Sequence, residues 1–543
     1  MQRLDYFVIL LFTIMILVVG LAFTRSGANM KSYFAAGGSL PWWLSGLSLF
    51  MSFFSAGTFV VWGSIAYDLG WVAITIQWMM ALGGFFIGFY IAPKWRRAGV
   101  LTVGEYIGNR FGSGLEKFYS YIFLVLSFVT TGAFLYPVAK LFNVSSGLSI
   151  ELSILILGCL IIVYTTAGGL WAVIITDVLQ FIILFAAVLI VVPLAFDKTG
   201  GINSFLNQVP DDFFAFINGE YTFWFLVAFL FYNAIYIGGN WAYVQRYTSV
   251  ANAKDAKKVG WLFGALYLIS PILWMLPPMI YRTLDGGLGG LENEGAFMLM
   301  CKQVLPTGML GLMLGGMIFA TASSVNTTLN MQAAVFTNDI FKATKKPAKP
   351  NLMLVARIST VFFGLITIGV ALMVPRLGGI VEVVLSVGAI TGAPLFAPPI
   401  WSLFSNRQNS KSILTATLVS LAINLFFKFV SPWLLDFGLN RAEEMLVGVV
   451  TPLLILATFE FFNRRSKYTS LAMPIQEKRA ISKALLSSQN YFAIKVLGIS
   501  TSITGLLVLV LGTLANTGAW IVGAIGILIL SVGVWLLRRG TKS

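Results

Sequence analysis

The sequence MIFATASSVNTTLNMQAAVFTNDIFK, residues 317–342, carries a row of polar side chains in an otherwise hydrophobic stretch. The row follows helical spacing, i, i+3, i+4 and i+7, and comprises Ser323, Asn326, Thr327 and Asn330. Six polar residues in the eight positions 323–330 place many oxygen atoms on and beside one face of this helix. Hydroxyl side chains in membrane helices often only hydrogen-bond a neighbouring helix. So dense a stripe nevertheless favours a site for a hard cation, because such cations take oxygen ligands.

The composition indicates a polytopic helical membrane protein. Of 543 residues, 58% are hydrophobic and only 10% are charged, and helices satisfy their own backbone hydrogen bonds inside lipid. The net charge of +15 does not indicate nucleic-acid binding, because the basic residues cluster in short loops between apolar segments. The sequence has no histidine, which excludes catalytic triads that use histidine, HExxH zinc sites and haem ligation by histidine. We expect neither an enzyme nor a catalytic residue.

Hydrophobic segments and loop charges together predict the topology. About fifteen segments are long enough to span a bilayer as helices. Basic residues gather in alternate loops and acidic residues in the others, which predicts an outside N-terminus and a cytoplasmic C-terminus in the plasma membrane. Arg246 is assigned to one of the cytoplasmic loops. The expected divisions are an extra helix (1–30), two five-helix repeats (31–194 and 195–405), two additional helices (406–465), a basic cytoplasmic linker (466–490), and two C-terminal helices with a tail (491–543).

Two of the expected spans are interrupted at corresponding places. The second contains SFFSAG at residues 52–57, and the seventh contains IGGN at residues 237–240. Spans two to six and seven to eleven form equal sets of five, and an odd number of crossings inverts the second set relative to the first. Glycines in membrane helices can also serve close packing. Matching breaks at the start of two inverted halves instead indicate a secondary transporter with its site near the middle of the membrane.

Three motifs resemble the sodium:solute symporter family, with its sodium/sugar members the most similar. They are YFAAGGSLPWW at residues 33–43, GGLWAVIITDVLQ at residues 168–180, and ASSVNTTLNMQAAVFTNDIFK at residues 322–342. The resemblance covers about residues 5 to 435. It implies an all-α LeuT-type fold made of two inverted five-helix repeats plus flanking helices, which agrees with the pattern of the breaks.

The resemblance also implies a sodium ion, the expected cofactor, between the broken second span and the ninth. Its ligands would be the backbone carbonyls of Met51, Phe54 and Ala320 and the hydroxyls of Ser323 and Ser324. Sodium is a hard cation, and an unwound helix has carbonyls free to bind it. The apolar side chains of Met51 and Phe54 are no objection, because those residues would contribute only their main chain.

Charged residues inside spans need either a partner or an exit to the surface. Asp177 lies well inside the sixth span, and in family members with a second sodium site this aspartate is a ligand together with residues that match Asn326 and Thr327. The alternative is that Asp177 caps the start of a helix at Thr176. Lys428, in the twelfth span, is expected to extend its amine to the outer surface.

The resemblance points to five residues for solute binding: Phe53, Thr58, Gln77, Asn240 and Tyr243. Tyr243 would be an aromatic gate below the solute. Phe53 makes the pocket less polar than in sugar carriers, which counts against an ordinary hexose. Gln77 fits equally well as a core amide that bonds a neighbouring helix.

These features together predict a sodium-coupled secondary active symporter. It would import a small organic solute, sugar-like or another polar metabolite, by alternating access, with the solute, sodium and the lipid bilayer as its partners and no nucleic acid. A transporter-like membrane sensor acting with a separate signalling protein is the main alternative. A polytopic membrane enzyme would need a nucleophile and a base, and a channel would need a filter motif, neither of which the sequence displays.

Overall fold

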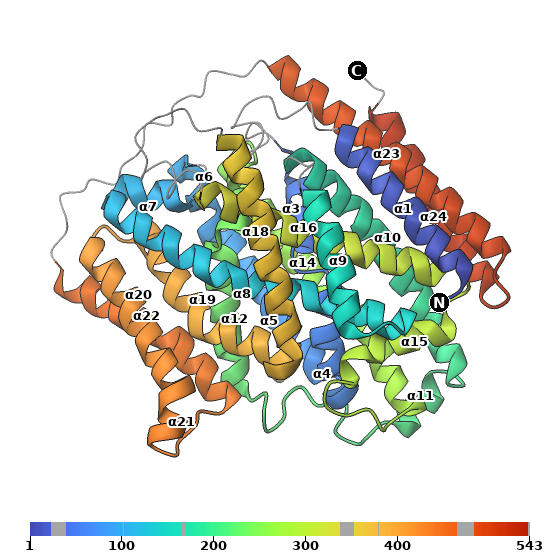
Figure 1. Cartoon of the computed structure of the whole chain (residues 1–543), viewed down its shortest axis with the longest axis horizontal. Coiled ribbons are helices and arrows are strands. Elements are labelled where there is room, and N and C mark those ends of the chain that lie inside the picture. Colours follow the sequence, from blue (N-terminus) through green and yellow to red (C-terminus); the bar gives the residue numbers. More distant parts are fainter. Residues whose placement is uncertain are drawn as a thin grey trace.

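The protein is an all-helical assembly in the part of the chain that the structure, a computed structural model, describes: residues 1–22, 40–100, 103–165, 170–336, 352–377, 379–463 and 483–540. Ten helices in these ranges are long and apolar enough to cross a membrane, or eleven if one bent pair counts as a single span. Such helices are expected where a chain must satisfy its backbone in lipid. Figure 1 shows the helices gathered in one body, with α23 and α24 next to α1 along one edge.

The first half of the chain contains the broken second span and the sixth span that carries Asp177. Its helices are α1 (Arg3–Ala22), α3 (Trp42–Met51), the π-helical η3 (Thr58–Trp62), α4 (Gly63–Leu69), α5 (Val72–Phe86), η4 (Ile87–Ile91), α6 (Ala92–Ala98), α7 (Val103–Phe111), α8 (Ser113–Ser146), α9 (Ile150–Thr165), α10 (Leu170–Lys198) and α11 (Ile202–Gln208).

The second half contains the broken seventh span and the ninth span with the polar stripe. Its helices are α12 (Phe223–Gly239), α13 (Trp241–Thr248), α14 (Ala253–Leu284), η5 (Asn293–Gly295), α15 (Ala296–Val304), α16 (Met309–Val335), α18 (Leu352–Met373), η7 (Val374–Leu377), α19 (Ile380–Phe404), α20 (Ser410–Leu425), η8 (Phe426–Val430), α21 (Ser431–Leu434), α22 (Arg441–Phe462), α23 (Lys483–Thr513) and α24 (Ala519–Gly540). The number of about fifteen spans stays a prediction, because ten or eleven helices of the described residues are long and apolar enough to cross a membrane.

The break in the second span lies where the sequence predicted it. Helix α3 ends at Met51, and residues 52–55 leave the helical conformation before η3 begins. The side chain of Thr58 holds this turn together, since its hydroxyl donates to the carbonyl of Phe53 at 2.5 Å and accepts from the backbone N–H of Ser55 at 3.3 Å. The turn therefore has a defined shape rather than being a loose interruption.

The break in the seventh span is a sharp bend. Helices α12 and α13 meet at Asn240 with their axes turned by 65°. The side chain of Asn240 caps α13, because its amide oxygen accepts a hydrogen bond from the backbone of Ala242 at 3.0 Å. Gly239 allows α19 to approach, since a Cβ at this position would lie 2.7 Å from the Cβ of Phe396.

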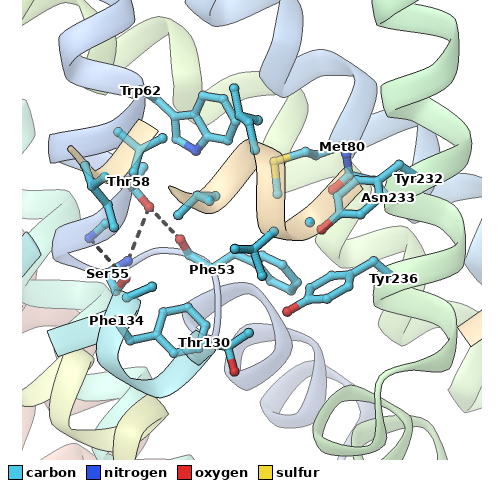
Figure 2. A pocket seen from close by; sticks show the side chains of 18 of the residues that line it. Phe53, Ser55, Thr58, Trp62, Met80, Thr130, Phe134, Tyr232, Asn233 and Tyr236 are labelled. Atoms are coloured by element: carbon cyan, nitrogen blue, oxygen red, sulfur yellow. Dashed lines mark hydrogen bonds between the residues drawn. The ribbon is translucent and has the colours of Figure 1, made fainter. Parts of the chain in front are cut away.

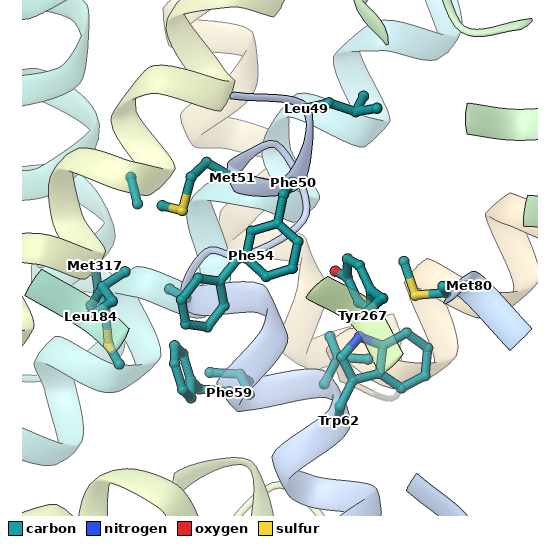
Figure 3. Packing of buried hydrophobic residues seen from close by; sticks show 14 of the residues in the cluster. Leu49, Phe50, Met51, Phe54, Phe59, Trp62, Met80, Leu184, Tyr267 and Met317 are labelled. Carbon is teal, nitrogen blue, oxygen red and sulfur yellow. The ribbon is translucent and has the colours of Figure 1, made fainter. Parts of the chain in front are cut away.

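Aromatic side chains fill the core around the first broken span (Figure 3). Phe54 stacks on Trp274 of α14 with ring centroids 3.9 Å apart, and Phe50 stacks on the same indole at 5.7 Å. Glycines bring η4, which continues α5, into close contact with α14, because a Cβ on Gly260 would lie only 2.6 Å from the Cα of Gly88. The first broken span is thus packed firmly against α14 on one side.

Lys428 does not extend freely to the outer surface, contrary to expectation. Its amine bonds Glu382 of α19 at 2.8 Å, Glu444 of α22 at 2.9 Å and the hydroxyl of Ser386 at 2.9 Å. The two carboxylates, which come from different helices, attract the ammonium more strongly than water at the membrane surface does. Lys428 therefore ties α19 to α22.

Candidate functional site

Two neighbouring cavities lie between the broken spans. The central cavity, of about 150 Å³, is lined by residues of the first break and of α5, α8, α12, α14 and α19. The polar cavity, of about 70 Å³, is lined by residues of α3, α8, α10, α13, α16 and α19. Tyr236 and Tyr243 border both. These two tyrosines thus form part of the wall between the cavities.

Most of the predicted sodium ligands lie beside the polar cavity. Met51 at the end of α3 and both Ser323 and Ser324 on α16 border it. Ala320 is buried one turn before Ser324, whose hydroxyl lies 3.5 Å from the Ala320 carbonyl. Phe54 is buried in the aromatic core and borders neither cavity, so its role as a main-chain ligand stays a prediction.

Asp177 is the charged centre of this region. It lies two turns inside α10, which begins at Leu170, so it does not cap the start of that helix. Its carboxylate accepts hydrogen bonds from Ser48 of α3 at 2.7 Å and from Ser323 of α16 at 2.9 Å. Three helices that are distant in the sequence therefore meet at one buried carboxylate, next to the predicted ion ligands.

Arg246 is a residue of this region that the sequence did not predict. The loop-charge pattern assigned it to a cytoplasmic loop, but it lies in α13 with only 3% of its surface exposed. It borders the polar cavity together with Asp177, and the two attract each other electrostatically. The break at Asn240 was the available signal, because the second half of a broken span returns into the protein.

Three of the predicted solute residues border the central cavity: Phe53, Thr58 and Tyr243. Figure 2 shows the first two. The rings of Phe53 and Tyr243 lie against each other with centroids 4.6 Å apart. Tyr243 also contacts Tyr236 edge to face at 5.9 Å. The hydroxyl of Thr58 already forms two hydrogen bonds within the break. Thr58 is therefore less able to hydrogen-bond a solute than its residue type suggests.

Asn240 and Gln77 lie elsewhere. Asn240 borders the polar cavity, where its side chain also caps α13. Gln77 borders neither cavity: its amide oxygen accepts from the indole N–H of Trp274 at 3.3 Å, and its amide nitrogen donates to the carbonyl of Ala73 at 3.2 Å. This geometry favours the alternative in which Gln77 is a core amide bonding a neighbouring helix.

Part of the predicted site lies outside the described residues. This applies to the side chains of Asn326 and Thr327, and to residues 33–39, 168–169 and 337–342 of the family motifs. Within the ranges that are described, no group of three or more histidine, cysteine or acidic side chains could hold a metal ion. The oxygen atoms in this region are those of hydroxyls and carbonyls near one carboxylate, a set that could coordinate a hard monovalent cation.

Comparison with known proteins places this chain among ion-coupled transporters. The family model for the sodium:solute symporter family matches residues 33–420. The chain is 28% identical over 475 residues to solute carrier family 5 member 4B of Mus musculus, covering 78% of this chain and 71% of that protein. It is 27% identical over 495 residues to the sodium/glucose cotransporter of Vibrio parahaemolyticus, covering 83% and 89%. It is 28% identical over 443 residues to the sodium/sialic acid symporter NanT of Aliivibrio fischeri, covering 78% and 88%.

Solved structures establish the fold. The outward-open, substrate-bound state of a Na⁺-coupled sialic acid symporter superposes with a TM-score of 0.70 at 23% identity, covering 86% of this chain and all of that one. The nucleobase-cation-symport-1 family transporter MHP1 superposes with a TM-score of 0.54 at 14% identity, covering 82% and 98%. The expected LeuT-type fold is thereby confirmed. The broken helices agree with the family model that matches residues 33–420, and the chain belongs to the sodium:solute symporter family.

Proposed function

We propose that this protein is a sodium-coupled symporter that imports a small organic solute by alternating access. The observation that carries the proposal is the meeting of α3, α10 and α16 at Asp177, beside a cavity that shares its wall with a second one. A cation next to Asp177 stabilises one arrangement of these three helices. The relatives whose names specify sodium/glucose and sodium/sialic acid transport support the same reading.

Sodium would be held by the carbonyls of Met51, Phe54 and Ala320 and the hydroxyls of Ser323 and Ser324. The Ser323 hydroxyl donates its proton to Asp177 at 2.9 Å. A hydroxyl oxygen that donates its proton can also coordinate a cation, and the carboxylate makes it a better ligand. Asp177 would act here as the support of a ligand.

A second sodium ion would use Asp177 directly, with Asn326 and Thr327 one helical turn beyond the serine pair. One ion moving through 100 mV releases about 2.3 kcal/mol, and a tenfold gradient adds about 1.4 kcal/mol. One ion therefore supports roughly 500-fold accumulation of solute, and a second would square that limit.

The solute would occupy the central cavity, and Tyr243 would couple it to the ion. Tyr243 contacts Phe53 of the first break and borders the polar cavity as well. Movement of the first broken span on sodium release would therefore be transmitted to the ring beneath the solute. Asn240, at the bend between α12 and α13, would contact the solute once that ring moves. Gln77 is assigned a structural role instead.

We further propose that the N-terminus lies outside and the C-terminus in the cytoplasm of the plasma membrane, with the division into two inverted repeats at residues 31–194 and 195–405. Arg246 does not contribute to the loop charges that support this orientation, because it is buried. The remaining basic residues still gather in alternate loops. A role as a sensor would use the same sites without net transport.

Uptake into proteoliposomes tests the function. A panel of labelled sugars, sugar acids, amino acids and nucleobases is presented under an inward sodium gradient or an equal potassium gradient. We expect accumulation of at least one solute class with sodium only, abolished by an ionophore that collapses the gradient. The double variant Ser323→Ala with Ser324→Ala should lose it. The control Ser420→Ala, which removes a buried hydroxyl of α20 bonded only to its own helix, should not. Sodium-dependent binding without accumulation would favour the sensor.

A further inference from the structure

The central cavity has a chemical character that restricts the solute. Among the described residues that line it, none is charged. Arg246 and Asp177 border only the neighbouring polar cavity, and Lys428 with its two carboxylates does not border either cavity. An ion without a partner is strongly disfavoured in such surroundings. The central cavity is therefore suited to a neutral molecule.

The walls of this cavity are largely aromatic. Phe53, Trp62 and Phe134 surround it together with Tyr236 and Tyr243, as Figure 2 shows for those it labels. Flat aromatic faces bury a ring-shaped molecule well and fix its orientation by stacking. The shape and polarity of the walls thus favour a solute with a ring over an extended polar chain.

Most hydroxyl and amide donors around the cavity are already committed to the protein. Thr58 donates to the carbonyl of Phe53 at 2.5 Å, and Thr391 donates to Val387 at 2.7 Å. Other donors of the lining also bond the backbone of their own helices: Ser52, Thr130 and Asn233. These five side chains therefore offer few free donors to a hexose, which has a hydroxyl on almost every carbon.

Tyr267 is different. It lies on α14, borders the central cavity, and is fully buried, yet its hydroxyl has no hydrogen-bond partner within the described part of the chain. Buried hydroxyls nearly always have a partner. Figure 3 shows Tyr267 beside Trp62 and Met80, which line the same cavity. An unpaired, buried hydroxyl thus belongs to a side chain that lines the central cavity.

We propose that the solute is a neutral, ring-bearing molecule with a hydrogen-bond acceptor, stacked between the aromatic walls and held by a hydrogen bond from Tyr267. The proposal rests on the function proposed above and specifies its substrate class. Tyr267 is a specificity-determining residue in this account: it selects for a carbonyl or ring-nitrogen acceptor and against analogues without one. An anion such as a sialic acid would find no cationic side chain in the cavity.

Calorimetric binding to the purified protein, in sodium and in potassium, tests the proposal. The probes are uracil and nicotinamide as neutral planar acceptors, glucose as a polyol, and N-acetylneuraminate as an anion. We expect at least one planar probe to bind in sodium, with no binding of glucose or N-acetylneuraminate. Tyr267→Phe should weaken that binding about 5- to 150-fold, because one buried hydrogen bond is lost. Tyr119→Phe is the matched control, since its hydroxyl bonds Thr417 at 2.6 Å away from both cavities.

The outcomes separate this proposal from the proposed function. Sodium-dependent binding of glucose or N-acetylneuraminate would overturn the substrate class and leave the symport proposal standing. Unchanged affinity of a planar probe in Tyr267→Phe would overturn the role of Tyr267, as would failure of both planar probes to bind. Binding of a planar probe equally in sodium and potassium would support the substrate class but contradict sodium coupling.

Discussion

Replacement of Asp177 separates its charge from its hydrogen bonds. Its carboxylate accepts two hydroxyl protons, at 2.7 Å from Ser48 and 2.9 Å from Ser323. Hydrogen bonds to a charged group contribute about 1.5–3 kcal/mol each, so Asp177→Ala should lower the free energy of unfolding by about 3–6 kcal/mol at most. The net loss is smaller, because removing a buried charge also removes its desolvation cost.

Asp177→Asn should behave differently. Its amide oxygen can accept from one serine, and its amide nitrogen can donate to a lone pair of the other, so both contacts persist. We expect Asp177→Asn to lose less stability in potassium than Asp177→Ala, because both serine contacts persist while each variant leaves buried Arg246 without its carboxylate. The affinity of this variant for sodium should be at least about tenfold lower than that of the wild type. The reason is that no carboxylate supports Ser323 or balances the charge of the cation.

Thermal unfolding followed by tryptophan fluorescence, in matched sodium and potassium series, measures both effects. Asp5→Asn is the control: Asp5 is also buried, but its carboxylate accepts from Gly308 and Gly311 at the start of α16. This variant should lose stability equally in both salts. The reasoning is refuted if Asp177→Asn keeps the full response to sodium, or if it is destabilised as much as Asp177→Ala in potassium.

Three further substitutions test the surroundings of the site. Gln77→Leu leaves the indole of Trp274 unpaired and should lower stability by about 1–3 kcal/mol without changing solute affinity in calorimetry; a selective loss of solute affinity would contradict its structural role. Lys428→Met should destabilise by about 1–2 kcal/mol in thermal unfolding, a modest value because Glu382 is partly exposed; no change would show that the ion pairs are solvated. Burial raises the pKa of Glu294 in the loop before α15, despite hydrogen bonds that lower it. The folded protein therefore gains stability as pH falls from 7 toward the ordinary value near 4.5, and Glu294→Gln should remove that gain; an unchanged pH profile would refute this.

The positions of the helices and of both breaks could be predicted from the sequence alone. Hydrophobic length defines a span, and glycines with a capping residue such as Asn240 define a bend, so both signals are local. The polar stripe of α16 was visible for the same reason, since helical spacing alone aligns Ser323 with its neighbours. These local features were sufficient for the fold and for locating the candidate ion site, which stays a prediction.

Contacts between distant helices could not be predicted in this way. Loop charge placed Arg246 in solvent, whereas the bend at Asn240 turns it into the protein. Lys428 looked like a residue near the membrane surface until Glu382 was found opposite it. The free hydroxyl of Tyr267 has no sequence signal at all, because it depends on which groups from other helices fail to reach it.

The central claim is that sodium binds where α3 and α16 meet, and a sodium titration of purified protein tests it without knowledge of the solute. Thermal unfolding is recorded against sodium chloride at constant ionic strength, with potassium as the replacement. A ligand that binds only the folded state at one hundred times its dissociation constant stabilises by about 2.7 kcal/mol. We predict a saturable rise in the melting temperature for the wild type and for Ser420→Ala, and a clearly smaller rise for Ser323→Ala with Ser324→Ala, in which only the second proposed ion could still bind. An equal rise in the double variant would contradict the site, and no rise in the wild type would contradict sodium binding itself.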